Sequence, residues 1–371
     1  RYDTSYSNHY QSCQNNSDLI NVNHAKLDNT VYHIPVVVHV FHSGEAIGEG
    51  SNISDSVIAD AINGVNKRWR NFNGLGVDLG IDFCLASVDP NGNSTTGIVR
   101  IDASNIPLYS SGGTKMLNDT ACDGVAVDDT IIKNLSTWPV SDYYNIWVVN
   151  DICGNVAGYA YFPWGGKFDG ALMMYSYMNG SLNTLSHELG HGFNLQHTFR
   201  GDGGNVDCPV DTACTTDGDM VCDTPPHKNS DCGEVNPCAN EGVWDNSRFN
   251  YMSGCATRNR FTEGQKNRVR SAAEIYPRVS LLTSSNSNCP NTSLIELNKE
   301  KEKITIFPNP FMLEAIITTN VRGSFYLYDI FGRLVDVIDI TNESTEIRKS
   351  HLNAGMYFYK FSNQSGRIVI Y

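Results

Sequence analysis

The sequence predicts an α+β domain of α/β character, followed by a small all-β domain. Strand-like and helix-like patterns alternate between residues 31 and 277, as in a sheet packed against helices. The composition then changes, because no Cys follows Cys289 and no Trp follows Trp244. Residues 304–371 are short alternating runs separated by turn residues, which is typical of a β-sandwich. We therefore expect a tail or pro-segment remnant (1–30), the first domain (31–279), a polar linker (280–300) and the β-sandwich (301–371).

The spacing of apolar residues predicts the elements of the first domain. The β-branched run VYHIPVVVHVF at 31–41 predicts a buried strand, on which His33 and His39 are structural. Ser54 is a good N-cap for a helix over 54–72, where apolar residues recur every three or four positions. Ser181 likewise is expected to cap a helix over 182–193. The other predicted strands cover 81–88, 144–149 and 170–178, the other helices cover 128–135 and 261–276, and a loop-rich insertion covers 102–126.

One stretch, HELGHGFNLQH at 187–197, carries recognisable chemistry. On a helix, His187 and His191 project from one face because they are four residues apart. Two such imidazoles can bind one Zn²⁺, and Glu188 is placed to act on a water activated by the ion. His197 can be the third ligand only if the chain turns after His191. Asn194 is at the turning position, and Asn tolerates the left-handed conformation that such a turn requires.

A surface helix with unrelated histidines is the simple alternative for HExxH alone. The third histidine, and Asn250-Tyr251-Met252-Ser253 downstream, favour the zinc site instead. Three neutral imidazoles leave a position for water, whose pKa falls from about 15.7 toward about 7. We expect Glu188 to accept the proton of that water and to pass it to the leaving amine. An extended peptide would then add to the strand before the helix, at Ala171, Leu172, Met173 and Met174.

Composition narrows the partners and the compartment. The net charge of −13 over 371 residues argues against nucleic acid and anionic membranes as partners. No apolar run is long enough to span a bilayer, and the start at Arg1 suggests a processed or trimmed form. Eleven cysteines without a Cys-x-x-Cys pair favour disulfides in an oxidising compartment over a zinc cluster. The odd count leaves one thiol, for which we favour Cys13, either as a plug on the zinc or as a free or paired cysteine.

The ordered segments of the first domain resemble the pappalysin family of the metzincin clan. The resemblance covers residues 31–277 and rests on the zinc sequence, the later Met and five further segments: YNIWVV, GYAYFPWGGKFDGALM, HTF, GDMVCDTPP and FTEGQKNRVR. In the carboxy-terminal region, FPNP, YDIFGRLV and LNAGMYFYKF resemble the sorting domain that Bacteroidetes-type bacteria use for type IX secretion. The resemblance implies a twisted five-stranded mixed sheet, a zinc helix and an irregular lower half. It also implies a secreted protein that is recognised by secretion machinery.

The resemblance also implies roles for particular residues. Met252 would be the Met-turn residue that forms an apolar floor under the three imidazoles. A calcium site would take oxygens from Asp219, the carbonyl of Cys222 and Thr224, although acidic loops are more often simply solvated. The pairings to be expected first are Cys232–Cys255, and Cys238 with either Cys214 or Cys208.

Two departures from the family pattern lie just after Met252. Gly254 occupies the position where the family often places a Tyr that can stabilise an oxyanion. Near the Met-turn, some members have an acid that selects basic substrate residues. This chain offers Cys255 and Arg258 there, so a preference for Arg or Lys is not expected.

The leading hypothesis is a secreted zinc endopeptidase, a monomer acting on proteins or peptides with Zn²⁺ and a candidate Ca²⁺. A thermolysin-like site is disfavoured because His197 already supplies the third ligand. From another class, the alternative is an adhesion or carbohydrate-binding surface protein with a vestigial zinc site. A vestigial site would be expected to lack Glu188 or one histidine, and all four residues are present.

Overall fold

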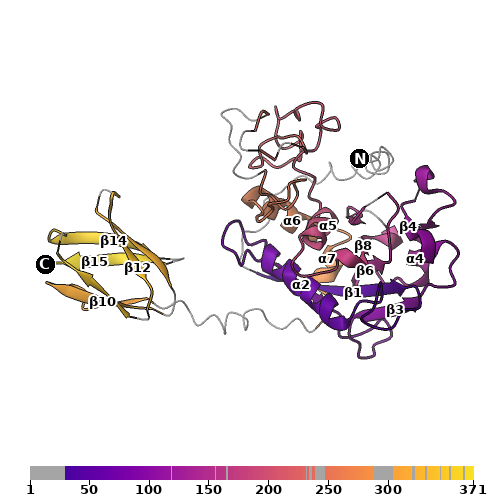
Figure 1. Cartoon of the computed structure of the whole chain (residues 1–371), viewed down its shortest axis with the longest axis horizontal. Helices are drawn as coiled ribbons and strands as arrows, with labels where there is room; N and C mark the ends of the chain where they lie inside the picture. The colour runs from indigo at the N-terminus through magenta and orange to yellow at the C-terminus, as the bar shows by residue number, and fades with distance from the viewer. Residues whose placement is uncertain are drawn as a thin grey trace. The chain divides into compact units, whose positions relative to one another are not determined.

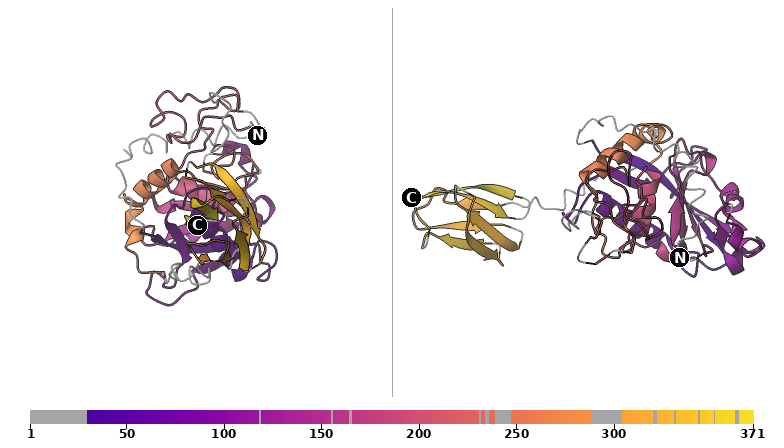
Figure 2. Two further views of the ribbon diagram at one scale, coloured as in Figure 1. Left: turned by 90° about the vertical axis from the view of Figure 1, so that its left-hand side faces the viewer. Right: turned by 90° about the horizontal axis from the view of Figure 1, so that it is seen from above.

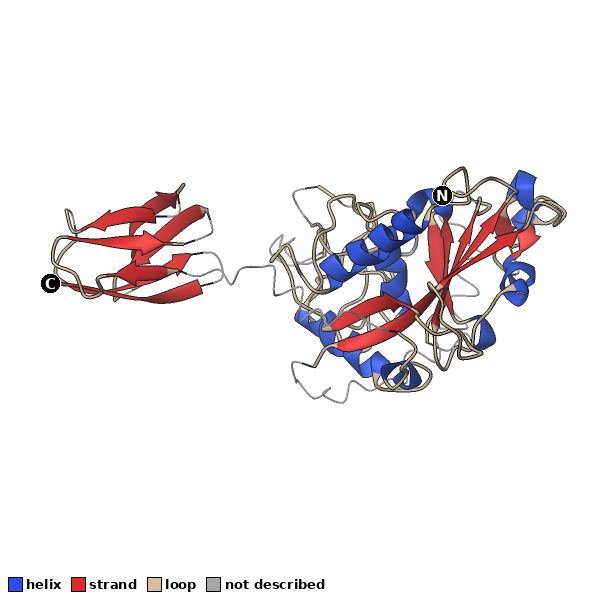
Figure 3. Cartoon of the chain, turned by 90° about the horizontal axis from the view of Figure 1, so that it is seen from below, coloured by secondary structure: helices blue, strands red, loops and turns tan. Residues whose placement is uncertain are grey.

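The computed structural model describes residues 30–287 and 304–371, except 118, 155, 164–165, 231, 234–235, 239–246, 320–321, 331, 343, 351 and 362–363. The chain divides into two compact units, Arg1–Cys289 and Pro290–Tyr371. The first contains helices and strands, whereas the described part of the second is built of strands (Figures 1 and 3). None of the helices in the described ranges combines the length and the apolar character that crossing a bilayer requires.

A mixed sheet forms the centre of the first unit, with the strand order β2-β1-β6-β8-β7 and β3 also paired to β1. All pairs are parallel except β7 with β8. The sheet has six strands where five were expected, because β1 is long enough for two short partners on one side: β2 pairs with Tyr32–Val36 and β3 with Val38–His42. The bounds are β1 Tyr32–His42, β2 Ile81–Leu85, β3 Ile98–Asp102, β6 Tyr144–Val149, β7 Gly158–Ala160 and β8 Gly170–Met174.

Apolar side chains fill both faces of this sheet. Alternate residues of β1 (Ile34, Val36, Val38) pack into the main core with the helices α2, α5, α6 and α7. The opposite face packs with the shorter α3 and α4, in a second cluster that contains Phe41 and Trp147. Figure 2 shows the helices and strands of the chain from two further directions. The helices are α2 Asp55–Trp69, α3 Tyr109–Gly112, α4 Asp129–Leu135, α5 Thr184–Gly192, α6 Glu263–Ala273 and α7 Val279–Leu282.

A side-chain N-cap marks the start of α2 and of α6, but not the start of α5. Ser54 caps α2 as predicted, accepting a hydrogen bond from the Val57 amide. Thr262 and Gln265 form a complete capping box at α6. The prediction of Ser181 as the cap of the zinc-motif helix is wrong, because α5 begins at Thr184 with Asn183 before it. The Ser181 hydroxyl donates to Asn179 Oδ1 instead.

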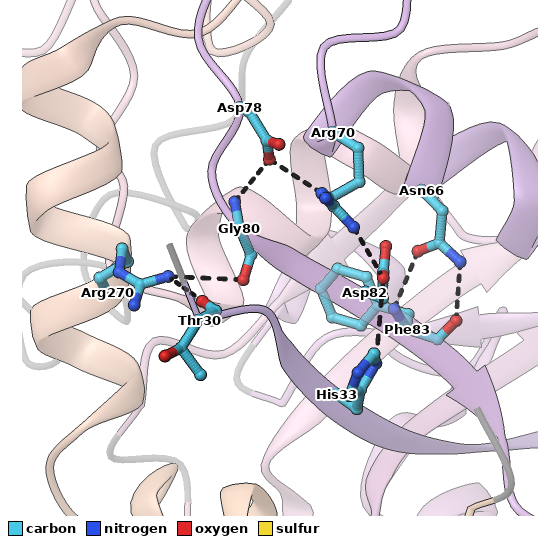
Figure 4. A network of polar contacts seen from close by, with 9 residues as sticks. All are labelled: Thr30, His33, Asn66, Arg70, Asp78, Gly80, Asp82, Phe83 and Arg270. Atoms are coloured by element: carbon cyan, nitrogen blue, oxygen red, sulfur yellow. Dashed lines mark hydrogen bonds and ion pairs between the residues drawn. The ribbon is translucent and has the colours of Figure 1, made fainter. Parts of the chain in front are cut away.

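Polar contacts fasten the start of β1 and the edge strand β2 to the helices (Figure 4). The Asn66 side chain of α2 bonds both the amide and the carbonyl of Phe83, each at 2.8 Å, and so satisfies part of the edge of β2. The buried Asp82 accepts from Arg70 Nη1 at 2.9 Å. From α6, Arg270 Nη1 donates to the carbonyl of Thr30 at 2.9 Å. These bonds fix the frame on which the zinc-motif helix rests.

Residues 198–260 differ from the sheet region, since no named strand or helix occurs among those that are described. Three disulfides cross-link them: Cys208–Cys238, Cys214–Cys222 and Cys232–Cys255. The predicted Cys232–Cys255 pair is confirmed, and of the two alternatives for Cys238 the partner is Cys208. Cys122 and Cys153 join two loops beside the sheet, whereas Cys13 lies outside the described residues.

The predicted linker begins too early. Leu281 of α7 is buried in the main core of the first unit, and the carbonyl of Asn286 accepts from the Ser87 amide at 2.8 Å. Residues 280–286 therefore belong to the first unit. The apolar run in these residues is too short to form a periodic pattern, so the sequence does not reveal this packing.

The second unit is a sandwich of two antiparallel sheets, β13-β10-β9 and β12-β11-β14-β15. Its core comes from inward-facing residues of both sheets, among them Ile317, Phe325 and Ile368. Burial alternates residue by residue along β10, as the sequence predicts. The strands are β9 Thr305–Phe307, β10 Glu314–Thr318, β11 Gly323–Tyr328, β12 Leu334–Ile340, β13 Ser344–Arg348, β14 Gly355–Phe361 and β15 Gln364–Ile370.

Candidate metal centre

Helix α5 carries the first part of the site and is buried from Leu185 to Gly192. Its glycines permit close contacts that a larger residue would prevent. A Cβ on Gly190 would lie 2.4 Å from Met252 Sδ, and a Cβ on Gly192 would lie 2.1 Å from the Tyr144 hydroxyl. The helix can therefore pack directly on the Met252 segment and on β6 while it presents His187 and His191.

The chain turns after α5 as the sequence predicts. Asn194 has a φ of 71°, in the left-handed region. The Asn194 amide donates to the carbonyl of His191 at 2.9 Å, and the Leu195 amide donates to that of Gly190 at 2.8 Å. This is the Schellman pattern of helix termination. Arg268 of α6 secures the turn, because its Nε donates to the Asn194 carbonyl at 2.6 Å.

The turn brings the third histidine to the first two. The Nε2 atoms are 3.2 Å apart for His187 and His191, and 3.0 Å from each of these to His197. Within the described ranges, this trio is the group of His, Cys, Asp and Glu side chains that could hold a metal ion. Three nitrogens at Zn–N distances of about 2.0–2.1 Å in a tetrahedral site lie roughly 3.3 Å apart, so the trio fits zinc closely.

Hydrogen bonds to two of the rings define which nitrogens face the centre. His187 Nδ1 donates to the carbonyl of Tyr251 at 2.7 Å, and His191 Nδ1 donates to that of Leu195 at 2.7 Å. A carbonyl accepts only from a protonated nitrogen, so Nε2 of each neutral ring carries a lone pair. Lone pairs directed at one another across about 3 Å repel unless a cation lies between them. The arrangement of His187 and His191 therefore favours a bound cation between the two rings.

Burial reinforces this protonation state. It lowers the pKa of His191 to about 4 and the pKa values of His187 and His197 well below the ordinary 6.5, so the three rings are neutral at physiological pH. Burial raises the pKa of Glu188 to about 8, against the opposing charge of Arg258. Glu188 Oε2 is buried and has no hydrogen-bond partner in the structure. A bound metal ion would place a positive charge near this carboxylate.

Met252 is fully buried against α5, as the Met-turn assignment expects. Its flanking backbone holds the ligands: the carbonyl of Tyr251 accepts from His187, and the carbonyl of Met252 accepts from the Thr198 amide at 3.2 Å. The turn thus links the first histidine to the residue that follows the third. Two phenylalanine rings also contact the histidines. The Phe199 ring stacks on His197 with 4.5 Å between ring centroids, and the Phe162 ring is tilted against His191 with 5.5 Å between centroids.

Sequence reasoning did not single out these two phenylalanines. Phe162 lies in a Gly-rich segment without periodic apolar residues, and Phe199 is adjacent to a ligand only because of the turn at Asn194. The structure also explains Gly254: a Cβ there would lie 1.6 Å from Asn229 Oδ1. The space where a larger side chain would start is occupied by that amide.

The prediction of β8 as the substrate edge strand is wrong. Ala171, Leu172 and Met173 pair with β7 on one side and with β6 on the other, and all three are buried. The Met174 amide also donates to the carbonyl of Ala157 at 3.0 Å. Strand β7 forms one end of the sheet in the described part of the chain, and β2 forms the other. Its three residues lie in a Gly and aromatic segment that gave no strand signal.

The candidate calcium residues are partly brought together. Thr224 Oγ1 donates to Asp219 Oδ2 at 2.7 Å, and both residues are buried. Burial raises the pKa of Asp219 to about 8, in spite of its bonds to Thr224 and to the Val221 amide. The sulfur of Cys222 is bonded to Cys214. A buried carboxylate of this kind gains from a nearby cation.

Two protein families match the chain. The family described as pregnancy-associated plasma protein-A matches residues 126–274, which include the histidine trio and Met252. The secretion system C-terminal sorting domain matches residues 305–370, the strands of the second unit. The two matches correspond to the two compact units.

Relatives and solved structures agree with the first match. An extracellular metalloprotease of Arthroderma otae is 30% identical over 261 residues, which are 66% of this chain and 78% of that protein. One of Sordaria macrospora is 31% identical over 153 residues, 36% of this chain and 48% of that protein. The chain thus spans about half the length of several curated relatives that it matches.

Mature mirolysin of Tannerella forsythia, in complex with a cleaved peptide, has a similar fold. It is 26% identical, with a TM-score of 0.52, over 70% of this chain and 99% of that chain. A promirolysin mutant of the same organism is 24% identical, with a TM-score of 0.53, over 75% of this chain and 92% of that chain. The chain belongs to the pregnancy-associated plasma protein-A, or pappalysin, family of metalloproteases.

Proposed function

We propose that this protein is a secreted zinc endopeptidase in which Glu188 is the general base. The observation that carries the proposal is the convergence of three neutral imidazoles beside a buried carboxylate. The fixed Nδ1 bonds of His187 and His191 leave nitrogen lone pairs that suit zinc. When bound, zinc supplies a Lewis acid that acidifies a water and polarises the scissile carbonyl.

Glu188 handles the proton in this proposal. Its carboxylate accepts a proton as the water attacks the peptide carbonyl, and it then delivers that proton to the leaving amine. The buried Oε2 without a hydrogen-bond partner fits the task, because burial raises the pKa of Glu188 to about 8 against the charge of Arg258, while the charge of a bound cation would favour the ionised form. In the described residues the histidine group itself contains no carboxylate, and Glu188 directly follows His187 in the sequence.

The substrates are proteins or peptides bound in extended form. We assign the docking edge to β7, whose outer side ends the sheet in the described part of the chain. The mirolysin relative was solved with a cleaved peptide, which supports the substrate class. We expect the enzyme to act as a monomer.

The second unit is proposed to direct the chain to type IX secretion machinery, in line with its family match. It has its own hydrophobic core, so deletion of residues 304–371 should leave proteolysis by the first unit intact. The alternative function, adhesion with a vestigial site, gains no support, because all three histidines converge and Glu188 is present next to His187. A cation at Asp219, Cys222 and Thr224 is proposed as Ca²⁺ that stabilises the loop region.

The test is cleavage of a denatured protein by the purified chain. Wild-type protein with zinc should digest it, and a zinc chelator should stop digestion until zinc is restored. Glu188→Gln should retain zinc and the fold but lose several decades of rate, because the base is gone. A Glu188→Gln variant as fast as wild type would refute the role of Glu188. A zinc-loaded wild type without proteolysis would refute the function.

A further inference from the structure

A buried ion pair holds strand β7 from the face of the sheet that packs with α3 and α4, which we call the far face. Asp129 and Lys133 of α4 are fully buried, and Lys133 Nζ donates to Asp129 Oδ2 at 2.5 Å. The Tyr159 hydroxyl of β7 donates to the same oxygen at 2.6 Å, and the Tyr161 hydroxyl does so at 3.4 Å. One carboxylate oxygen of α4 thus accepts from two residues at and just after β7.

The Lys133 ammonium contacts the rings of the same two tyrosines. Its Nζ lies 5.1 Å from the ring centroid of Tyr159 and 4.3 Å from that of Tyr161, and it lies 5.2 Å from that of Trp147 on β6. A cation over the face of an aromatic ring is attracted to it. Asp129 therefore holds the tyrosines by their hydroxyls, and Lys133 holds them by their rings.

Stability alone does not explain a charged pair at this place. Taking two charges out of water costs free energy that their mutual attraction often does not return, and apolar residues can frequently replace such a pair without loss of stability. What the pair adds is direction, because hydrogen bonds to one oxygen require both hydroxyls at fixed places. The Asp129–Lys133 pair is therefore suited to fixing the position of β7.

Strand β7 needs such an anchor because it is short. It covers Gly158–Ala160 and pairs with β8 over these three residues. Tyr159 and Tyr161 pack in the cluster on the far face, whereas Ala160 packs against the main core. Since alternate residues of a strand face opposite sides, a slip by one residue would turn Ala160 toward Asp129 and remove both hydroxyl bonds.

The register of β7 also determines how this edge meets the metal centre. Phe162 directly follows Tyr161, is buried, and has its ring centroid 5.5 Å from that of His191. The outer side of β7 is the edge to which the proposed function assigns an extended substrate. A peptide paired with β7 takes its register from that strand. A shift of β7 would therefore move the scissile bond away from its productive position at the metal.

We propose that Asp129 and Lys133 are positioning residues that hold β7 in the register required to bind substrate. The inference rests on the proposed endopeptidase function, with β7 as its docking edge. Neither residue is placed to touch a substrate, because both are fully buried. Loss of the anchor should therefore weaken main-chain pairing with the peptide and leave zinc binding intact.

The test removes the anchor in two ways. Tyr159→Phe removes one hydroxyl from β7 and keeps the ring beside Lys133. Asp129→Leu combined with Lys133→Met removes both charges and the acceptor, whereas Asp129→Asn combined with Lys133→Met keeps an oxygen that can accept from the tyrosines. Tyr109→Phe is the matched control, because the Tyr109 ring belongs to the same far-face cluster but its buried hydroxyl donates to the carbonyl of Phe41.

The measurement is cleavage of one peptide that wild type cuts, and of a series in which each amide away from the scissile bond is N-methylated in turn. An N-methyl group removes one main-chain donor, so wild type should lose about fivefold in kcat/KM at alternate amides, those that face β7. Tyr159→Phe and the Leu/Met double variant should raise KM for the unmethylated peptide about fivefold, keep kcat within about twofold, and reduce the alternating loss below about twofold. Tyr109→Phe and the Asn/Met double variant should behave as wild type.

Melting temperature and zinc content distinguish positioning from a purely structural role. A structural role would lower the melting temperature of Tyr159→Phe and Tyr109→Phe alike and leave KM and the alternating loss as in wild type, and that result overturns the inference. If the double variants fail to fold, Tyr159→Phe decides the question. Wild type that cuts the peptide without alternating losses also overturns the inference, while the endopeptidase function stands. Failure of zinc-loaded wild type to cut any peptide overturns the proposed function itself.

Discussion

The two parts of the first unit are held together by different means, and the metal centre lies where they meet. The sheet and its helices are ordered by apolar packing, with a main cluster on one face of the sheet and a second cluster on the other. The described residues between 198 and 260 lack named strands and helices and carry three disulfides. His187 and His191 belong to the packed part, whereas His197 and Met252 belong to the cross-linked part or its border. Damage to either part is therefore expected to weaken the site.

The largest loss is expected from a cavity in the packed part. Trp69 is fully buried, touches the rings of Phe83, Phe193 and Phe261, and donates to the carbonyl of Ser186. Trp69→Ala should lower the free energy of unfolding by about 3–5 kcal/mol and weaken zinc binding, because Phe193 ends α5. Phe72→Ala is the control, because Phe72 lies just after α2, the helix that contains Trp69, and its side chain is 52% exposed. Equal denaturation midpoints for the two variants would contradict the account.

The cross-linked part should respond to loss of a disulfide. Removing Cys232–Cys255 as a double serine variant releases a loop of sequence separation 23 and should cost about 3 kcal/mol of stability. Since Cys255 follows Met252 closely, zinc affinity should fall as well. Limited proteolysis should then cut within residues 198–260 before it cuts the sheet. Cleavage that starts in the sheet would show that the disulfide does not order this region.

A buried histidine outside the site makes the packed part sensitive to acid. Burial lowers the pKa of His39 to about 4, against the opposing hydrogen bond with Asn145. Below pH 6.5 the unfolded chain takes up a proton that the folded chain refuses, so stability falls from about pH 6.5 to about pH 4. Between pH 7.5 and pH 5 the contribution of His39 is about 2 kcal/mol. The difference between wild type and His39→Gln, measured by urea unfolding at both pH values, should show this loss; a pH-independent difference would refute it.

The smallest effect is expected at Asn194, in the turn that joins the packed part to the cross-linked part. Asn194 has a left-handed backbone, and its buried side-chain amide has no partner in the structure. Asn194→Gly should change the free energy of unfolding by less than about 1 kcal/mol, while Asn194→Ala should lower it by about 1–2 kcal/mol, because Ala bears the cost of the left-handed conformation. Both variants remove the same amide, so their difference isolates the backbone. Identical stabilities would mean that φ at this position is not what limits the turn.

Sequence reasoning succeeded where a local rule determines the structure. Ser54 follows the preference for N-caps, Asn194 follows the tolerance of Asn for positive φ, and the 187/191 spacing follows the helical repeat. The trio could be predicted because its residues lie within eleven positions of one another. Cys232–Cys255 was predicted from the family resemblance and is confirmed.

The features that sequence reasoning missed depend on long-range contacts or on very short elements. Strand β7 has three residues, too few for an alternating pattern, so β8 was taken as the edge. The start of α5 was misplaced. The Ser181 hydroxyl donates to Asn179 Oδ1, and the helix begins three residues later, at Thr184. The contact of Arg258 with His187 joins residues 71 positions apart, and no spacing rule predicts it.

Zinc binding by the trio is the central claim, and equilibrium competition with a chelator of known zinc affinity tests it most directly. The wild-type chain should bind one zinc ion, and His197→Ala should weaken binding by more than the 10–100-fold that loss of a supporting hydrogen bond costs, because a ligand itself is removed. Unchanged zinc affinity in His197→Ala would contradict the account, because the third imidazole would then not be a ligand.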